Sequence, residues 1–307
     1  SVGDMEKVAH FFRDYGGWEE VGSYDSHRSV LDFWDLSGTV SAKEILLQSE
    51  GLPFGQIRLQ KFHGTQPSYI RSSQNPWDTG GIMDINLRVH SVKESFEELR
   101  EMGWHGLSDP LFQTMGPFKL YDILMKGYDD IIIAFTHRTE PPLQLTAGLN
   151  IPSHIYNSSI IVKDLKVARE FYIDQLGFQL LNEYSLRKEK PEENMFGLPF
   201  NMADKVTCKA HIVSPDGDRD TLFQIIEFEG VEGKDFSDKA IPPNRGLLLY
   251  RCEVEDIQTY FEELQIKRVP IHKPLQPLHI EPYGSVNCFA VRSPNGVWWE
   301  FLEKSKN

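Results

Sequence analysis

The segment Val162 to Phe178, VKDLKVAREFYIDQLGF, decides how this chain is expected to fold. An apolar residue followed by Asp164 and Leu165 ends a strand. The next apolar residues fall on one helical face, and Gly177 then stops the helix. The segment therefore predicts a strand, a capped helix and a second strand.

The same pattern occurs near the start of the chain, 160 positions earlier. The matching residues there are Val2, Asp4, Met5, Phe11, Phe12, Asp14, Gly17 and Trp18. A second pair of segments, Val89–Leu99 and Val254–Leu264, repeats 165 positions apart. The chain is thus duplicated, and each half holds two related units. A unit of roughly 60 to 80 residues is too small to bury much core alone, so we expect the units to pair.

These features resemble the glyoxalase, or vicinal oxygen chelate, superfamily. The resemblance rests on the spaced aspartate, the Phe-Tyr helix and the Leu-Gly-Phe ending, and on the turn Ser293–Gly296 that leads into Val297–Phe301. It implies an α+β fold of four βαβββ units, paired into two cupped mixed β-sheets. We expect an N-terminal domain over 1–140 with a structural or accessory role, a linker over 141–152, and a C-terminal domain over 153–307 that holds the active or binding cup.

Composition excludes several classes of function. The chain has 32 Lys and Arg against 45 Asp and Glu, a formal charge of −13, and we find no basic stripe that would suit nucleic acid. No apolar run approaches the ~20 residues that cross a bilayer, and no signal peptide is recognised, so we expect a cytoplasmic protein. Three distant cysteines favour reduced thiols.

Local patterns predict the elements of each unit. The expected helices cover 6–15, 92–102, 166–175 and 257–264, with a short helix and loop over 41–53. The expected strands cover 19–23, 30–36, 56–62, 83–89, 130–136, 223–229, 247–253 and 297–302. The insertion 187–204 is either a flap over a pocket or a loop packed on the other half. The repeat begins at Val2, where a first strand should end, so either residues precede Ser1 or this unit lacks its opening strand.

Glu300 is the best candidate for a catalytic residue. Strand alternation puts it on one face with Trp298 and Leu302. In the resembling family the glutamate after this turn points into the cup and binds a metal. The other ligand positions carry over, one at a time, to Asn157, Gln224 and Leu249 in the second half, and to Arg58, Asp84 and Ala134 in the first.

Zinc and iron sites are normally built from three or more strong donors, which these positions do not supply. The resemblance implies one possible cofactor, a divalent metal. Its ligands would be Glu300, Asn157 and Gln224.

Without a metal, the second cup still offers a site for a small organic molecule, anionic or aromatic. Arg251 shares the face of Leu249 and would capture a carboxylate or phosphate, while Glu300 abstracts a proton next to a carbonyl. Trp298 would line the wall. His279 and Tyr283, in a proline-rich loop with His272, would reach the mouth.

The preferred function is an enzyme of the lyase, isomerase or ring-cleaving oxygenase kind. The alternatives are a metal-free small-molecule binding protein of the drug-resistance kind and a non-catalytic scaffold. Fold alone does not choose among them, and either a monomer or a homodimer is compatible with four units in one chain.

Overall fold

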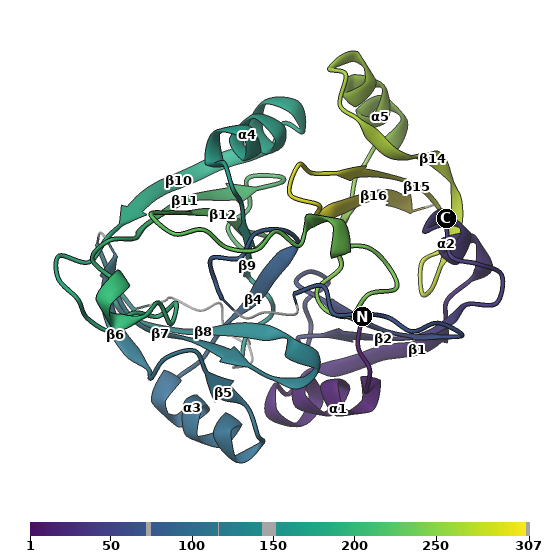
Figure 1. The fold of residues 1–307 in the computed structure, drawn as a ribbon. Helices are drawn as coiled ribbons and strands as arrows, with labels where there is room; N and C mark the ends of the chain where they lie inside the picture. Colours follow the sequence, from purple (N-terminus) through teal and green to yellow (C-terminus); the bar gives the residue numbers. More distant parts are fainter. Residues whose placement is uncertain (72–74, 116, 143–151, 305–307) are drawn as a thin grey trace.

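The computed structural model describes residues 1–71, 75–115, 117–142 and 152–304 of the chain (Figure 1). It contains four related units of helix and sheet, three of which open with a strand. The expected α+β class of four βαβββ units in cupped mixed sheets is confirmed. No helix in the described ranges is long and apolar enough to cross a membrane.

Unit 1 lies at the N-terminus. Its elements are α1 (Met5–His10), the π-helical turn η1 (Phe11–Tyr15), β1 (Glu19–Asp25), α2 (Arg28–Phe33), β2 (Ser41–Gln48) and β3 (Ile57–His63). Asp4 caps α1 by accepting a hydrogen bond from the backbone N–H of Lys7 at 3.1 Å.

Two expectations for unit 1 were wrong. Residues 30–36 were expected as a strand, but most of them belong to the helix α2. Val30, Leu31 and Phe33 are buried there at helical spacing, and the His27 side chain caps the first turn. Residues 41–53 were expected as a helix and loop, but their first part is the strand β2, whose burial begins with strict alternation.

Unit 2 follows with the expected order of strand, helix and further strands. Its elements are β4 (Ile82–Arg88), α3 (Val92–Glu101), β5 (His105–Gly106), β6 (Leu111–Met115), β7 (Phe118–Lys126), η2 (Tyr128–Asp130) and β8 (Ile132–Glu140).

Units 3 and 4 form the second half of the chain. Unit 3 contains β9 (Asn157–Ile161), α4 (Leu165–Arg169), η3 (Glu170–Gln175), β10 (Gln179–Leu186), η4 (Phe200–Met202), β11 (Thr207–Ser214) and β12 (Phe223–Glu229). After η5 (Ser237–Lys239), unit 4 contains β13 (Leu249–Glu253), α5 (Ile257–Ile266), β14 (Ile271–Ile280), β15 (Gly284–Arg292) and β16 (Trp298–Lys304).

The proline-rich stretch expected as a loop is the strand β14. It lies at the edge of its sheet, where proline is tolerated because one side of the strand needs no partner. Its pairing with β15 also shifts register between Ile271 and Gln276. His272 and His279 are therefore strand residues.

The sheets show which units pair. Units 2 and 3 form one sheet in the order β10-β11-β12-β9-β4-β8-β7-β5, with β6 on β7, and β4 and β9 run antiparallel at its centre. Unit 1 contributes the sheet β1-β2-β3, and unit 4 the sheet β13-β16-β15-β14. The expectation that each half closes its own cup was wrong, because the joint between β4 and β9 crosses the halves.

Four hydrophobic cores explain this arrangement. On the helix side, unit 1 shares a core with unit 2, and unit 3 shares one with unit 4. On the concave side, unit 2 packs against unit 3 and unit 1 against unit 4. We call the hollow between units 2 and 3 the central cup and that between units 1 and 4 the terminal cup. The halves 1–140 and 153–307 therefore each share a core, while each cup takes one unit from each half.

Candidate functional site

Glu300 lies on β16 and points into the terminal cup. Trp298 and Leu302 pack in the core of that cup, whereas Trp299 and Phe301 pack on the helix side. The alternation predicted from the sequence therefore holds.

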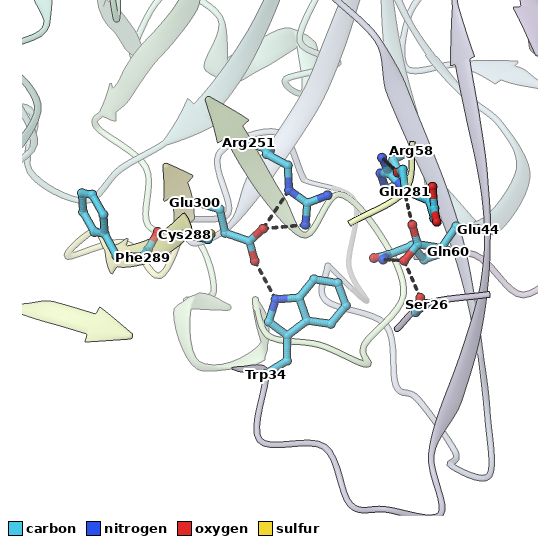
Figure 2. Close-up of polar contacts among 10 residues, drawn as sticks. All are labelled: Ser26, Trp34, Glu44, Arg58, Gln60, Arg251, Glu281, Cys288, Phe289 and Glu300. Atoms are coloured by element: carbon cyan, nitrogen blue, oxygen red, sulfur yellow. Dashed lines mark hydrogen bonds and ion pairs between the residues drawn. The ribbon is translucent and has the colours of Figure 1, made fainter. Parts of the chain in front are cut away.

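The Glu300 carboxylate is fully enclosed by protein donors. It is 0% exposed. Arg251 donates from Nε and Nη2 to Oε2 at 2.9 and 2.6 Å, and Trp34 of unit 1 donates from Nε1 to Oε1 at 2.6 Å (Figure 2). Burial by itself would lower the pKa of Arg251, but Glu300 and other neighbours raise it above its usual value. Oε2 is thus held in an internal ion pair, and Oε1 is held by a neutral indole N–H.

A second pair faces it from unit 1. Glu44 on β2 is 5% exposed and accepts hydrogen bonds from Arg58, Ser26 and Gln60, the last at 3.0 Å (Figure 2). Burial alone would raise the pKa of Glu44, but Arg58, Ser26 and Arg251 together hold it below its usual value. Since Arg251 acts on Glu44, the two pairs are electrostatically coupled across the cup.

A cavity of about 800 Å³ lies between β3 and β13. Arg58 and Arg251 both line it, with side chains 12% and 16% exposed, and so do Trp34, Leu46 and Tyr283. Four aromatic residues of the helix-side core of units 3 and 4 also line it, namely Phe178, Phe223, Tyr250 and Trp299. The lining of the cavity therefore includes two guanidinium groups and a group of aromatic rings.

The other predicted site residues are not all brought together. Asn157 and Gln224 belong to the sheet of the central cup, because their strands join unit 2. The Asn157 side chain accepts from the backbone N–H of Ser158, and Gln224 accepts from Tyr184. Placing them beside Glu300 was therefore wrong.

Three more predicted residues lie around the terminal cup. Tyr283 lines the cavity, and its hydroxyl donates to Gln56 at 3.2 Å. Trp298 is buried and its ring packs against that of His272. His279 Nε2 lies within hydrogen-bond distance of Glu281 Oε1, at 3.1 Å. Trp298 and His279 do not line the cavity.

The donors of neither cup suit a metal of the family type. In the terminal cup the ligand positions hold Leu249, which offers no donor, Arg58, which is a cation, and Glu300, which is bound by Arg251. No group of three or more His, Cys, Asp or Glu side chains in the described ranges is arranged to hold a metal ion. The proposed set of Glu300, Asn157 and Gln224 is divided between two sheets.

The central cup holds two buried carboxyl groups. Asp84 is 2% exposed and accepts from Asn86 at 3.0 Å, and Asp122 is 8% exposed and accepts from Thr136 at 3.2 Å. Burial raises the pKa of Asp84 to about 6 and that of Asp122 to about 7. These groups carry protons more readily than ordinary aspartates.

The insertion 187–204 packs into this cup. Leu198 is 8% exposed in its core, the Phe196 ring lies 5.0 Å from that of Phe228, and Gln113 of unit 2 donates to Met195 Sδ at 3.0 Å. The insertion was expected to be either a flap over a pocket or a loop packed on the other half of the chain. Its contact with Gln113 of unit 2 fits the second alternative.

Trp34 and Glu44 were missed by the sequence analysis. Both lie in segments whose secondary structure was mispredicted, so their faces could not be assigned. One residue in the sequence did indicate a buried acid. Arg58 stands at a ligand position inside the fold, and a buried arginine needs an acidic partner, which is Glu44.

Comparison with known proteins agrees with this fold. Residues 151–301 match the model of the Glyoxalase/Bleomycin resistance protein/Dioxygenase superfamily. The chain is similar to glyoxalase I from Zea mays, with a TM-score of 0.60 and 14% identity over 99% of this chain and 89% of that one. It is also similar to a putative dioxygenase from Bacillus subtilis, with a TM-score of 0.56 and 10% identity over 100% and 83% of the two chains. Among curated proteins, no match was found.

Proposed function

Since this chain belongs to the Glyoxalase/Bleomycin resistance protein/Dioxygenase superfamily, matched through residues 151–301, we propose that it binds a small organic anion, without a metal, in the terminal cup. The observation that carries the proposal is that Arg58 and Arg251 line one cavity from facing walls. A guanidinium binds carboxylate or phosphate through paired N–H donors.

The buried acids make these arginines suitable for binding. Glu300 and Glu44 fix the two guanidinium groups in place, so little side-chain freedom is lost when a ligand arrives. The bonds to Glu300 use Nε and Nη2 of Arg251, which leaves Nη1 as a donor for a ligand. The aromatic residues that line the cavity would contact the apolar part of the ligand.

Calorimetric titration with benzoate, salicylate and phenyl phosphate tests this proposal. We expect at least one of these anions to bind, and the variant Arg251→Met/Glu300→Gln to bind it at least tenfold more weakly. This variant removes the guanidinium but keeps an oxygen for Trp34. The control is Lys209→Met/Glu229→Gln, an exposed ion pair between β11 and β12 that does not line the cavity. Equal affinity in both variants, or no binding of any of these anions, would refute the proposal.

The enzyme alternative gives Glu300 the role of general base. It is favoured by the likeness to glyoxalase I over nearly the whole chain, which is a likeness of fold. Because both oxygens of Glu300 are engaged, a substrate would first have to displace Arg251 or Trp34. Exchange of the α-protons of phenylpyruvate into D₂O, followed by NMR, tests this role. Exchange that is catalysed by the protein and lost in Glu300→Gln would support it, and exchange that persists in that variant would exclude it.

A further inference from the structure

Two arginines face the concave side of the central cup from neighbouring strands. Leu87 of β4 packs in the helix-side core, so the next residue, Arg88, lies on the cup face. Ala134 of β8 packs in the core of the cup, so Arg138, four residues later, lies on that face as well. The two strands are parallel, and Arg88 pairs with Thr136. Arg138 is therefore one strand and two residues away, a Cα separation of roughly 8 Å that two long side chains can close.

Each of these guanidinium groups packs on an aromatic ring. Cζ of Arg88 lies 4.0 Å from the ring centroid of Tyr156, and Cζ of Arg138 lies 5.0 Å from that of Phe118. Such contacts hold a guanidinium in place but leave the N–H donors at its edge for an acceptor. The rings thus position both cations, as the buried glutamates do in the terminal cup, but they do not neutralise them.

Neither arginine has a close acidic partner in the described ranges. Arg88 Nη1 lies 3.5 Å from Asp220 Oδ1, which is longer than an ordinary hydrogen bond, and the Asp220 side chain is 45% exposed. No ion pair or hydrogen bond joins the Arg138 guanidinium to a described residue, and its Nε is buried without an acceptor. Burial lowers the pKa of Arg138, and repulsion by Arg88 lowers it further. Two cations therefore repel each other here, in a protein that has 45 acidic residues and a charge of −13.

We propose that Arg88 and Arg138 bind a phosphate group, free or esterified to a small molecule, at this end of the central cup. A phosphate carries about −1.5 to −2 charges at pH 7, so it neutralises both cations, and its oxygens accept from two guanidinium groups at once. A carboxylate carries one charge and would leave one cation unpaired. This site is separate from the terminal cup, where a buried glutamate already neutralises each arginine, and the inference does not depend on the proposed function.

Asp220 competes with the phosphate for Arg88. Besides its long contact to Arg88, it lies 3.9 Å from Nε2 of His154, a ring that is 1% exposed and has no hydrogen-bond partner among the described residues. Neither contact is short, so little is lost when the carboxylate turns to solvent. Its negative charge opposes a bound anion, and removal of that charge should tighten phosphate binding.

The test is calorimetric titration with inorganic phosphate at constant ionic strength. We expect saturable binding that is at least tenfold weaker in Arg138→Gln and at least threefold tighter in Asp220→Asn. The matched control is Arg100→Gln. Arg100 belongs to the same unit and also packs on a ring, but it is 56% exposed and pairs with Glu97 at 3.3 Å, so this variant should bind phosphate like the wild type. Titration with glycerol 3-phosphate identifies the source, because tighter binding than that of inorganic phosphate indicates an ester and weaker binding a free phosphate.

The variant Arg251→Met/Glu300→Gln separates this site from the terminal cup, since it should keep the binding that Arg138→Gln loses. Three results would overturn the proposal. One is the absence of saturable phosphate binding. Another is equal affinity in Arg138→Gln and Arg100→Gln, or a loss that occurs in the terminal-cup variant instead. The third is an affinity that does not increase in Asp220→Asn, a change at an exposed position that tests the site even if Arg138→Gln does not fold.

Discussion

The ion pair of Arg251 and Glu300 allows a direct test of whether Glu300 is held as a structural anion. The change is Glu300→Gln, which removes the charge but keeps an oxygen for Trp34. The two side chains are 16% and 1% exposed, so Arg251 would remain in a dry site without its counter-charge. Removing one partner of a buried pair typically costs about 3–5 kcal/mol.

The assay is urea unfolding followed by circular dichroism. A loss of this size corresponds to a fall in Tm of roughly 5–15 °C. In the double variant Arg251→Met/Glu300→Gln no buried charge is left unpaired, so we expect at least half of the lost stability to return.

The matched control is Glu253→Gln. Glu253 pairs with Lys304 across the same two strands, but these side chains are 55% and 41% exposed. Exposed pairs contribute about 0–1 kcal/mol, so this variant should be nearly neutral. If Glu300→Gln were as stable as the control, the carboxylate would not be a structural counter-ion, and the general-base alternative would gain support.

Further predictions concern other buried side chains of the two cups and the binding of metal ions. Trp34→Phe removes a buried donor to Glu300 and should cost about 1–3 kcal/mol in urea unfolding. Leu198→Ala should cost about 2–4 kcal/mol, whereas Phe200→Ala, at a position 61% exposed in the same insertion, should change the free energy of unfolding by less than about 0.5 kcal/mol. Asp122 has a pKa of about 7 when folded against about 3.9 unfolded, so the native state binds the proton more tightly and stability should fall, by at most about 4 kcal/mol, as pH rises from ~4 to ~7. Asp122→Asn should flatten that profile. Addition of Ni²⁺, Zn²⁺ or Mg²⁺ should shift Tm by less than about 1 °C, since the ligand positions hold an arginine and a leucine.

The sequence was sufficient for features that depend on local periodicity. Strand alternation after the turn at Ser293–Gly296 predicted the face of Glu300, and its neighbour Arg251 followed by the same rule. The repeats at 160 and 165 positions predicted the four units. These signals are local, so they survive any choice of how the units are arranged.

The sequence was insufficient for the pairing of units. A repeat shows that two segments fold alike, but not which neighbour each one meets. The joint between β4 and β9 is a long-range contact, and it separates Asn157 and Gln224 from Glu300. The short apolar run Val30–Trp34 suits either a strand or a helix, and the wrong choice concealed Trp34.

The two cups share a fold but differ in what fills them. The concave core of the central cup takes in Leu198 from the insertion, and its Asp84 and Asp122 are buried among hydrogen-bond donors of the protein. In the terminal cup, two arginines line a cavity, and each is neutralised by a buried glutamate on its own unit. Because a neutralised arginine keeps its hydrogen-bond donors while adding no net charge to the wall, such a cavity would recognise an anion by geometry more than by long-range attraction. Its affinity should therefore depend only weakly on salt, unlike that of a site built from unpaired lysines or arginines.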